Sequence, residues 1–299
     1  MVLLDKPLGW SSRQAVNSVV RIFTRAGEKR IKAGHGGTLD PLATGMLPIL
    51  IGEATRYAEL GLSAEKSYRV TFDLSYQTDT LDLEGEVTAR FEQVIGRETL
   101  EDALAAFRGD LDQVPPAYSA IRIDGRRAHE MARKGETVAM KSRRITILAL
   151  NLVAFEFPLV TLEVRCSKGT YIRSLARDIG ERLGLGGCVT ELRRLSTGGW
   201  PEAMMVNIDE LKTRQDQCLL PLAVWLRNLT PVQLSDDEPK RFLQGQRIQL
   251  KNSSAGEAEL EVAVFEAATL LGTGQLKSGM RHMVLHPVRI LPSAQALYL

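Results

Sequence analysis

The sequence predicts an α+β protein that ends in a small all-β unit, and three features of its 299 residues support this prediction. Helical and strand patterns are mixed along the chain, without internal repeats or low-complexity tracts. A hydrophobic content of 44% is enough to bury a real core, and the length favours two domains. Beyond about Asn228 the pattern changes to short strands and turns, so we expect a domain boundary near residues 225–234.

The elements of the first domain begin with a short apolar strand, which is followed by a helix. "SSRQAVNSVVRIF" opens with a capping box from Ser11 to Gln14 and then places apolar residues at positions 16, 19, 20 and 23 on one helical face. Alternation predicts half-buried strands in "SYRVTFDLSY", residues 67–76, and in "VTLEVRC", residues 160–166. The next segment, "SKGTYIRSLARDIGERLG", has helical spacing and ends at Gly184. It places Tyr171 and Arg173 at the start of that helix.

The last part of the chain contains three short strand patterns. They are "VAVFE" at 262–266, "LLGTGQL" at 270–276 and "HMVLHPVRILP" at 282–292. His282 and His286 flank the last of these, and the sequence offers no further ligands nearby for a zinc site. We expect core or surface imidazoles here, and an all-β unit of about seventy residues without a metal.

Composition also bears on the compartment. The start "MVLLDKPLGW" has no basic leader and no long apolar segment, and no later window has the roughly 18 apolar residues of a membrane span. We therefore expect a cytoplasmic protein that does not bind membranes. Cys166, Cys188 and Cys218 lie far apart, in a pattern that indicates neither disulfides nor zinc, so we expect buried thiols.

The charges are unevenly distributed, although the net charge is only +2. Residues 122–144 contain eight Lys or Arg against three acids, and residues 165–194 contain seven against three. Residues 73–112 contain eleven acids against three arginines. A surface formed by several basic segments is typical of nucleic-acid binding, although either segment by itself is also consistent with a solvated face.

One stretch carries a chemical signal, "GHGGTLDPLATGMLPI", which runs from Gly34 to Ile49. Asp40 precedes Pro41, which disfavours a helix interior and places this acid on a shaped loop among glycines. A structural reading stays open, because Asp-Pro pairs are common in turns. These glycines lack the Gly-Lys-Ser/Thr ending of a phosphate-binding loop, so nucleoside triphosphate binding is not indicated.

Several separated motifs in the right order resemble one family. They are "LLDKPLGWSS", "GHGGTLDPLATGMLPILIGEATR", "KSYRV", "VPPAYSAIRIDGRRAHEMARKG" and "CSKGTYIRSLARDIGERLG" with "LRRL" after it. From residue 2 to about 195 the chain resembles the bacterial tRNA pseudouridine synthases of the TruB type. The resemblance implies the pseudouridine synthase catalytic fold, with a mixed, largely antiparallel sheet, over residues 1–229. It also implies a small PUA-like RNA-binding domain over residues 230–299.

The resemblance further implies an activity: isomerisation of the uridine at position 55 in the T-loop of tRNA. That reaction flips the base out, breaks the bond between N1 and the ribose, and joins C5 to C1′ with no net gain of atoms. No cofactor or metal is needed. A carboxylate suits this chemistry because it is ionised at neutral pH and can form a labile covalent link. Asp40 matches the catalytic aspartate, which either attacks the ribose or first assists glycal formation.

The same resemblance assigns the other site residues. Arg173 matches the arginine that pairs with the aspartate, and a guanidinium fork suits that task better than lysine. Tyr68 matches the tyrosine that stacks on the flipped base and is proposed as the base for C5. His35 is expected to fill the space left by the flipped nucleotides. The remaining substrate-binding candidates are Tyr171, Leu192 and Lys6, the last with a mainly supporting role.

Two alternatives to a stand-alone tRNA enzyme stay open. RNA-guided pseudouridine synthases share "GHGGTLDP", but "PLATGMLPI" favours the stand-alone enzyme. A tRNA-folding chaperone without essential catalysis is the second alternative, which an inactive Asp40 variant would test. The expected partner is the T-arm of tRNA, and the expected state is a monomer.

Overall fold

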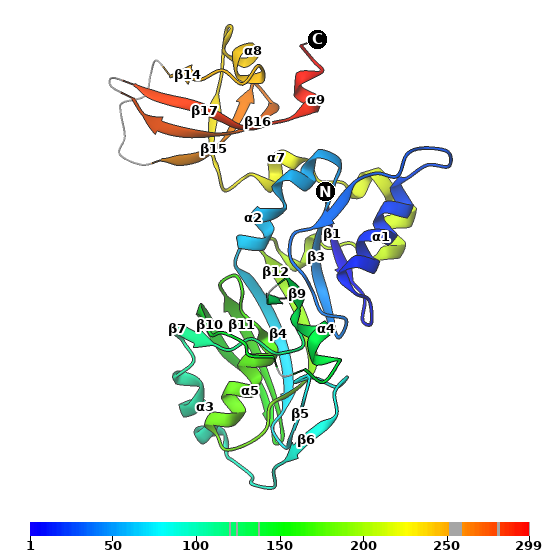
Figure 1. Ribbon diagram of the computed structural model, residues 1–299, viewed down its shortest axis with the longest axis vertical. Helices are drawn as coiled ribbons and strands as arrows, with labels where there is room; N and C mark the ends of the chain where they lie inside the picture. Colours follow the sequence, from blue (N-terminus) through cyan, green and yellow to red (C-terminus); the bar gives the residue numbers. More distant parts are fainter. Residues whose placement is uncertain (120, 124, 137, 251–258, 280–281, 299) are drawn as a thin grey trace. The chain divides into compact units, whose positions relative to one another are not determined.

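The computed structural model describes residues 1–119, 121–123, 125–136, 138–250, 259–279 and 282–298. These residues form two compact units, which are described separately below (Figure 1). The larger unit contains residues 2–49 and 57–215, and the smaller contains residue 1 and residues 50–56 and 216–299. Two positions of the basic segment 122–144, namely 124 and 137, lie outside the described residues.

The larger unit is built on one main sheet with helices against it. Its strands are β1 (Val2–Lys6), β2 (Ala33–His35), β3 (Ala43–Ile51), β4 (Lys66–Asp73), β5 (Tyr76–Thr78), β6 (Val87–Arg90), β7 (Gly109–Gln113), β8 (Arg122–Ile123), β9 (Arg126–Arg127), β10 (Arg143–Glu156), β11 (Leu159–Cys166) and β12 (Cys188–Thr197). Its helices are α1 (Ser12–Phe23), α2 (Ala58–Ser63), α3 (Arg97–Ala105), α4 (Ala128–Ala132), α5 (Ile172–Arg182) and α6 (Ile208–Arg214), with the 3-10 turn η2 (Glu202–Met204). The 3-10 turn η1 (Gly52–Tyr57) belongs to the smaller unit except for its last residue.

The main sheet of the described residues has eight strands, in the order β1-β3-β12-β4-β11-β10-β7, with β2 paired to β3. All the neighbours along this order are antiparallel except β3 and β12, which are parallel. The prediction of an α+β fold with a mixed, largely antiparallel sheet is therefore confirmed. The parallel pair brings the strand that follows the Asp40 loop next to the strand that contains "LRRL".

The alternating pattern that predicts a strand over residues 67–76 forms two elements in the structure. Tyr68, Val70 and Phe72 are buried on one face of β4, as alternation requires. The strand ends at Asp73, whose Oδ1 accepts hydrogen bonds from the backbone N–H and the hydroxyl of Ser75. Tyr76 therefore begins β5 instead of continuing β4, because a local Asx turn replaces the ladder hydrogen bonds.

Helices α1 and α5 begin and end where the sequence predicts. Ser11 and Gln14 form the expected capping box at the start of α1. At the start of α5, the side chain of Gln113 accepts from the N–H of Tyr171 and donates to its carbonyl. Gly184 ends α5 with a φ of +71°, a conformation that glycine adopts at low cost.

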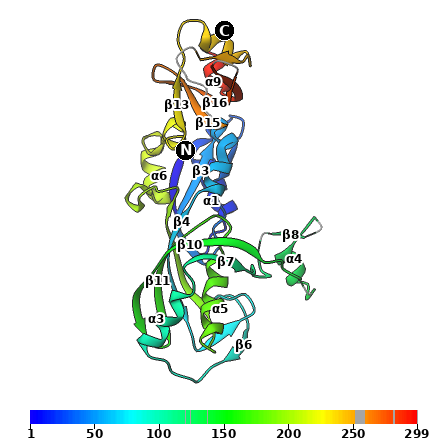
Figure 2. The same ribbon diagram turned by 90° about the vertical axis from the view of Figure 1, so that its left-hand side faces the viewer.

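Helices α3 and α5 contact each other, α3 packs on β10 and α5 packs on β12 (Figure 1). Figure 2 shows α4 and the β8–β9 hairpin standing away from the main sheet. The second hairpin, β5 with β6, contacts β12 through β5.

The smaller unit contains a five-stranded sheet in the order β13-β15-β16-β17-β14. Its elements are η3 (Gln215–Cys218), α7 (Leu222–Trp225), β13 (Thr230–Gln233), α8 (Glu238–Leu243), β14 (Ile248–Gln249), β15 (Leu260–Glu266), β16 (Thr269–Ser278), β17 (Met283–Ile290) and α9 (Pro292–Gln295). The predicted C-terminal β domain is present, and short helices α8 and α9 contact its sheet. All three cysteines of the chain are buried and unbridged.

None of the helices in the described part of the chain is long and apolar enough to cross a membrane.

Candidate active site

The loop between β2 and β3 holds Asp40 through hydrogen bonds on both sides. Before Asp40, the hydroxyl of Ser12 donates to the carbonyl of Leu39 at 2.8 Å and accepts from its N–H at 2.8 Å. After Asp40, the carbonyl of Pro41 accepts from the N–H of Gly9 at 2.9 Å. The carbonyl of Asp40 itself accepts from Ala43 at 3.1 Å. A loop bonded this densely presents its carboxylate in a fixed position.

Lys6 lies beneath this loop and is fully buried. Its ammonium donates to the carbonyls of Pro7 at 2.8 Å, Trp10 at 2.7 Å and Pro41 at 3.4 Å. Burial lowers the pKa of Lys6 to about 8, the charge of Asp40 raises it, and that of Arg194 lowers it. These contacts tie β1 to the loop and leave Lys6 without exposed surface for substrate.

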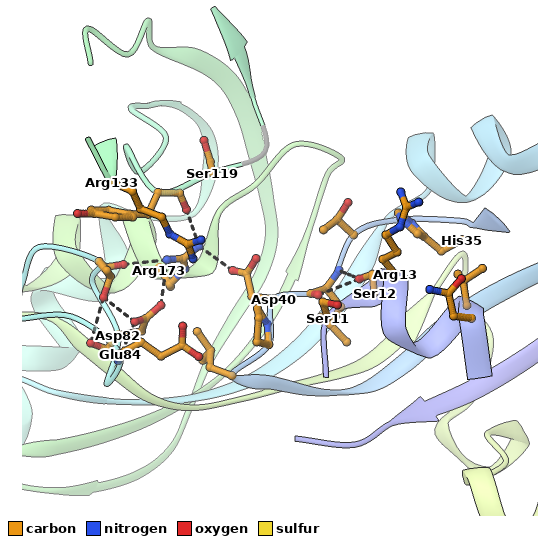
Figure 3. A pocket seen from close by; sticks show the side chains of 18 of the residues that line it. Ser11, Ser12, Arg13, His35, Asp40, Asp82, Glu84, Ser119, Arg133 and Arg173 are labelled. Atoms are coloured by element: carbon orange, nitrogen blue, oxygen red, sulfur yellow. Dashed lines mark hydrogen bonds and ion pairs between the residues drawn. The ribbon is translucent and has the colours of Figure 1, made fainter. Parts of the chain in front are cut away.

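Asp40 is paired with Arg173 of helix α5. The Nη2 atom of Arg173 lies 2.8 Å from Oδ2 of Asp40 (Figure 3). The carboxylate is 35% exposed, whereas the arginine side chain is only 6% exposed. Arg173 is therefore not a surface residue, because the start of α5 turns its side chain towards the loop. Asp40 is thus an anion that is paired on one side with the buried, permanently charged guanidinium of Arg173 and is open on the other.

A second carboxylate holds Arg173 from the other side. Oδ2 of Asp82 lies 2.9 Å from Nη1 of Arg173, and the side chain of Asp82 is only 3% exposed. Asp82 is itself fixed, because its Oδ1 accepts from the hydroxyl of Thr80 at 2.6 Å and from the N–H of Glu84 at 3.0 Å. The guanidinium also donates to the carbonyls of Thr80 at 2.8 Å and Tyr118 at 3.0 Å. Arg173 thus has a fixed direction before any substrate binds.

The Asp40–Arg173 pair lies in a cleft of about 1260 Å³ within the larger unit. In Figure 3, Arg13 and His35 lie towards one end of this cleft, Asp82, Glu84 and Arg133 towards the other, and Asp40 lies between. Arg30 and Lys32 also line it. Of the basic residues that line the cleft, Arg133 and Arg173 come from the two basic segments of the sequence. The cleft is therefore of mixed charge, because acids at 79–86 share it with these cations.

Of the seven residues proposed from the sequence, three line the cleft: His35, Asp40 and Arg173. His35 is half-buried, and burial followed by the charge of Arg194 lowers its pKa, which favours a neutral ring. Tyr171 directly precedes α5, makes no capping bond with its side chain and is half-buried, and burial raises the pKa of its hydroxyl. Neither its side chain nor that of Lys6 is part of the cleft lining.

Tyr68 and Leu192 lie on neighbouring strands beneath the loop and are 8% and 7% exposed. Leu192 is in register with Ala43 of β3 and Val70 of β4. Burial raises the pKa of Tyr68, while the charge of Arg194 acts in the opposite direction. The charge of Asp40 also raises this pKa, so Tyr68 lies within electrostatic reach of the carboxylate.

Sequence reasoning missed three residues that build the site: Ser12, Asp82 and Arg194. The only signal for Ser12 was its place beside the capping residue, and Asp82 was one acid among eleven in its segment. Arg194 stands in the quoted "LRRL", but nothing local marks it as buried, and it is 1% exposed. In the described part of the chain, no group of three or more His, Cys, Asp or Glu side chains could hold a metal ion.

Comparison with known proteins identifies the family to which the chain belongs. The family model described as "TruB family pseudouridylate synthase (N terminal domain)" matches residues 24–172. Those described as "tRNA pseudouridylate synthase B C-terminal domain" and "Pseudouridine synthase II TruB, C-terminal" match residues 173–227 and 230–291. The protein is an enzyme of the pseudouridine synthase class, an isomerase that acts on RNA. Within that class, the chain belongs to the TruB family.

Curated relatives and solved structures agree with this assignment. A protein of Zymomonas mobilis named "tRNA pseudouridine synthase B" is 42% identical over 275 residues, which are 89% of this chain and 91% of the relative. One of the same name from Cupriavidus pinatubonensis is 41% identical over 97% of this chain and 93% of its own length. A structure titled "Structure of H/ACA RNP bound to a substrate RNA containing 2'-deoxyuridine" matches with a TM-score of 0.74 and 22% identity. It covers 97% of this chain and 84% of that chain, and it shows that the fold is shared.

Proposed function

We propose that this enzyme converts uridine 55 in the T-loop of tRNA to pseudouridine, without a cofactor. The observation that carries the proposal is the Asp40–Arg173 pair, an accessible carboxylate held by a buried guanidinium at 2.8 Å in an open cleft. The names of the relatives, "tRNA pseudouridine synthase B", support tRNA as the substrate. The T-arm as the contact region, a monomeric state, the cytoplasm as the compartment and domains at 1–229 and 230–299 are parts of the same proposal.

In the proposed reaction the target uridine leaves its stack, which costs a few kcal/mol, and enters the cleft beside Asp40. The carboxylate acts at the ribose while the bond between N1 and C1′ breaks. The base turns, C5 bonds to C1′, and the proton that C5 carries is removed while N1 gains one. Atoms and electrons balance within the nucleotide, so no oxidant, reductant or group donor is required. Arg173 keeps the free side of Asp40 directed at the ribose.

The remaining cleft residues are proposed to contact the RNA or to take part in the movement of the target base. Arg13, Arg30 and Lys32 give the α1 end of the cleft a positive lining that suits phosphates. His35 lies at that end and is proposed to fill the space that the flipped nucleotide leaves. Tyr68 is proposed to stack on the base and to take the C5 proton. Because it is 8% exposed and outside the cleft lining, these roles require the RNA to open a path to its ring.

A direct experiment uses the purified full-length chain and an unmodified tRNA transcript with EDTA present and no guide RNA. Site-resolved detection is expected to show pseudouridine at position 55 and nowhere else, and a transcript with cytidine at 55 is the matched control. Absence of product would overturn the proposed function. Product only after addition of a guide RNA would favour the RNA-guided alternative, to which the shared fold also belongs. Product only after addition of a metal would contradict the cofactor-free mechanism.

A further inference from the structure

Arg194 of β12 is one of the largest fully buried side chains in the described part of the molecule, and it contacts the Asp40 loop directly. Its Nε donates to the carbonyl of Met46 at 2.7 Å, its Nη2 to that of Gly37 at 3.2 Å, and its Nη1 to that of Thr38 at 3.3 Å. Gly37 has a φ of +143°, and a Cβ built there would lie 3.5 Å from Nη1. The guanidinium therefore fixes the part of the loop that leads into Asp40.

The register of the sheet gives Arg194 a second partner. On one side of β12 it is opposite Gly45 of β3, and on the other it is opposite Tyr68 of β4. The charge of Arg194 lowers the pKa of the Tyr68 hydroxyl, against the larger effect of burial. Arg194 thus holds the loop of the proposed nucleophile and lies opposite the proposed base in the sheet.

The charge of Arg194 is unusual for an interior position. Among the ion pairs between described residues, Arg173 has two carboxylates and the adjacent Arg193 has two, whereas Arg194 has none. Its charge also lowers the pKa of Lys6, His35 and Lys66, so it acts on several groups around the loop. Burying a charge costs several kcal/mol, and apolar packing would avoid that cost. The contacts that offset this cost are the three hydrogen bonds that fix the loop and β3.

We propose that Arg194 is a positioning residue for catalysis, which holds the Asp40 loop through three carbonyls and keeps it in register with Tyr68, its opposite residue on β4. This inference rests on the proposed function. A lysine at this position keeps the charge, but its single ammonium does not reproduce the planar guanidinium that reaches three carbonyls. The predicted defect of Arg194→Lys is therefore in the chemical step and not in RNA binding, which depends on phosphate and stacking contacts elsewhere.

The experiment measures single-turnover isomerisation at saturating enzyme and tRNA affinity by filter binding. Arg194→Lys and Arg194→Gln are compared with Arg193→Lys as the matched control. Arg193 is the next residue on β12, but it pairs with Asp5 at 2.9 Å and Glu202 at 2.7 Å, away from the loop. We expect Arg194→Lys to lower the rate about 100-fold, as a small misplacement of reacting groups does. Affinity is expected within about threefold, with Arg193→Lys close to wild type in both.

A double-mutant cycle with Tyr68→Phe tests the connection to the tyrosine. If Arg194 acts partly through the hydroxyl, Arg194→Lys costs less in the Tyr68→Phe background than in wild type. Strict additivity overturns the connection to Tyr68, and a rate within threefold of wild type overturns the role in catalysis. Three other results also overturn the role in catalysis. They are an equal loss of rate in Arg193→Lys, a loss of rate in proportion to the unfolded fraction measured by urea titration, and failure of both Arg194 variants to fold. A wild-type enzyme without activity contradicts the proposed function, and the role of Arg194 with it.

Discussion

Arg173 and Asp82 form an ion pair of 2.9 Å in which the two side chains are 6% and 3% exposed. The same guanidinium reaches the more open carboxylate of Asp40 at 2.8 Å. Arg173 is thus shared by Asp82, which is buried, and by Asp40, which faces the cleft. Asp82 fixes the arginine, and the arginine fixes Asp40.

Removal of the charge of Asp82 tests this arrangement. Asp82→Asn keeps the shape but leaves Arg173 with Asp40 as its only paired carboxylate, so the ion pair in the cleft tightens and Asp40 becomes less free to react. We expect the single-turnover rate to fall at least about tenfold, or roughly 1.4 kcal/mol in the barrier. Unfolding free energy should also fall, by about 3 kcal/mol, because one partner of a buried pair is lost.

A surface ion pair is the control for that prediction. Glu163 pairs with Arg69 at 2.7 Å, but both side chains are well exposed. Glu163→Gln is expected to change stability by less than about 1 kcal/mol and the rate hardly at all. Equal effects of the two substitutions, measured by urea unfolding and single-turnover kinetics, would contradict a special role for Asp82.

Asp40→Asn removes the proposed nucleophile while it keeps the shape of the loop. We expect isomerisation to stop and tRNA affinity to stay within about tenfold, or roughly 1.4 kcal/mol, because phosphate and stacking contacts dominate binding. Pseudouridine formation over a long incubation and binding to labelled transcript are the two measurements. Substantial residual turnover would remove Asp40 from the nucleophile role, and loss of binding would make it a substrate-binding group instead.

Two substitutions at Tyr68 separate its ring from its hydroxyl. Tyr68→Phe keeps the ring, so it should bind tRNA but lose about 10²–10⁴-fold in rate if the hydroxyl is the general base. Tyr68→Leu also loses the stacking surface, worth roughly 1–3 kcal/mol. Single-turnover assays at saturating enzyme distinguish these effects. Near-normal turnover by Tyr68→Phe would leave the ring as a platform only.

The buried ammonium of Lys66 predicts a specific dependence of stability on pH. Burial, followed by the charge of Arg194, lowers the pKa of Lys66 to about 8, and its Nζ donates to the carbonyls of Leu62 and Ala64. An unfolded lysine keeps its proton up to about pH 10.4. Between these pH values the unfolded state binds more protons, so the contribution of Lys66 to stability increases as pH rises.

Urea unfolding from pH 8 to pH 9 measures this effect. Burial also raises the pKa of Cys166 to about 11, whereas an unfolded thiol titrates at about 8.5, so Cys166 contributes the opposite slope within this range. Comparison with a Lys66 variant, which shares Cys166, removes that contribution. Lys66→Met, which keeps the length and removes the charge, is expected to show a smaller rise in stability than wild type over this interval. An identical slope in the two proteins would mean that Lys66 is not perturbed as described.

The sequence by itself determined the local features that depend on near neighbours. Alternation predicted β4 and β11, the Ser11–Gln14 pair predicted the start of α1, and Gly184 the end of α5. These features follow from backbone geometry and capping within a few residues, so a single stretch of chain contains the information. The Asp-Pro pair likewise placed Asp40 on a loop outside any helix.

Only the tertiary structure decided which side chains meet at the site. Arg173 contacts Asp82 across 91 residues of sequence, and Arg194 contacts Gly37 across 157. Both contacts depend on the strand order, because β12 lies between β3 and β4 and α5 packs on β12. A local sequence pattern predicts a surface position for a charged residue. Its burial against a partner can be recognised only when the pairing of distant strands is known.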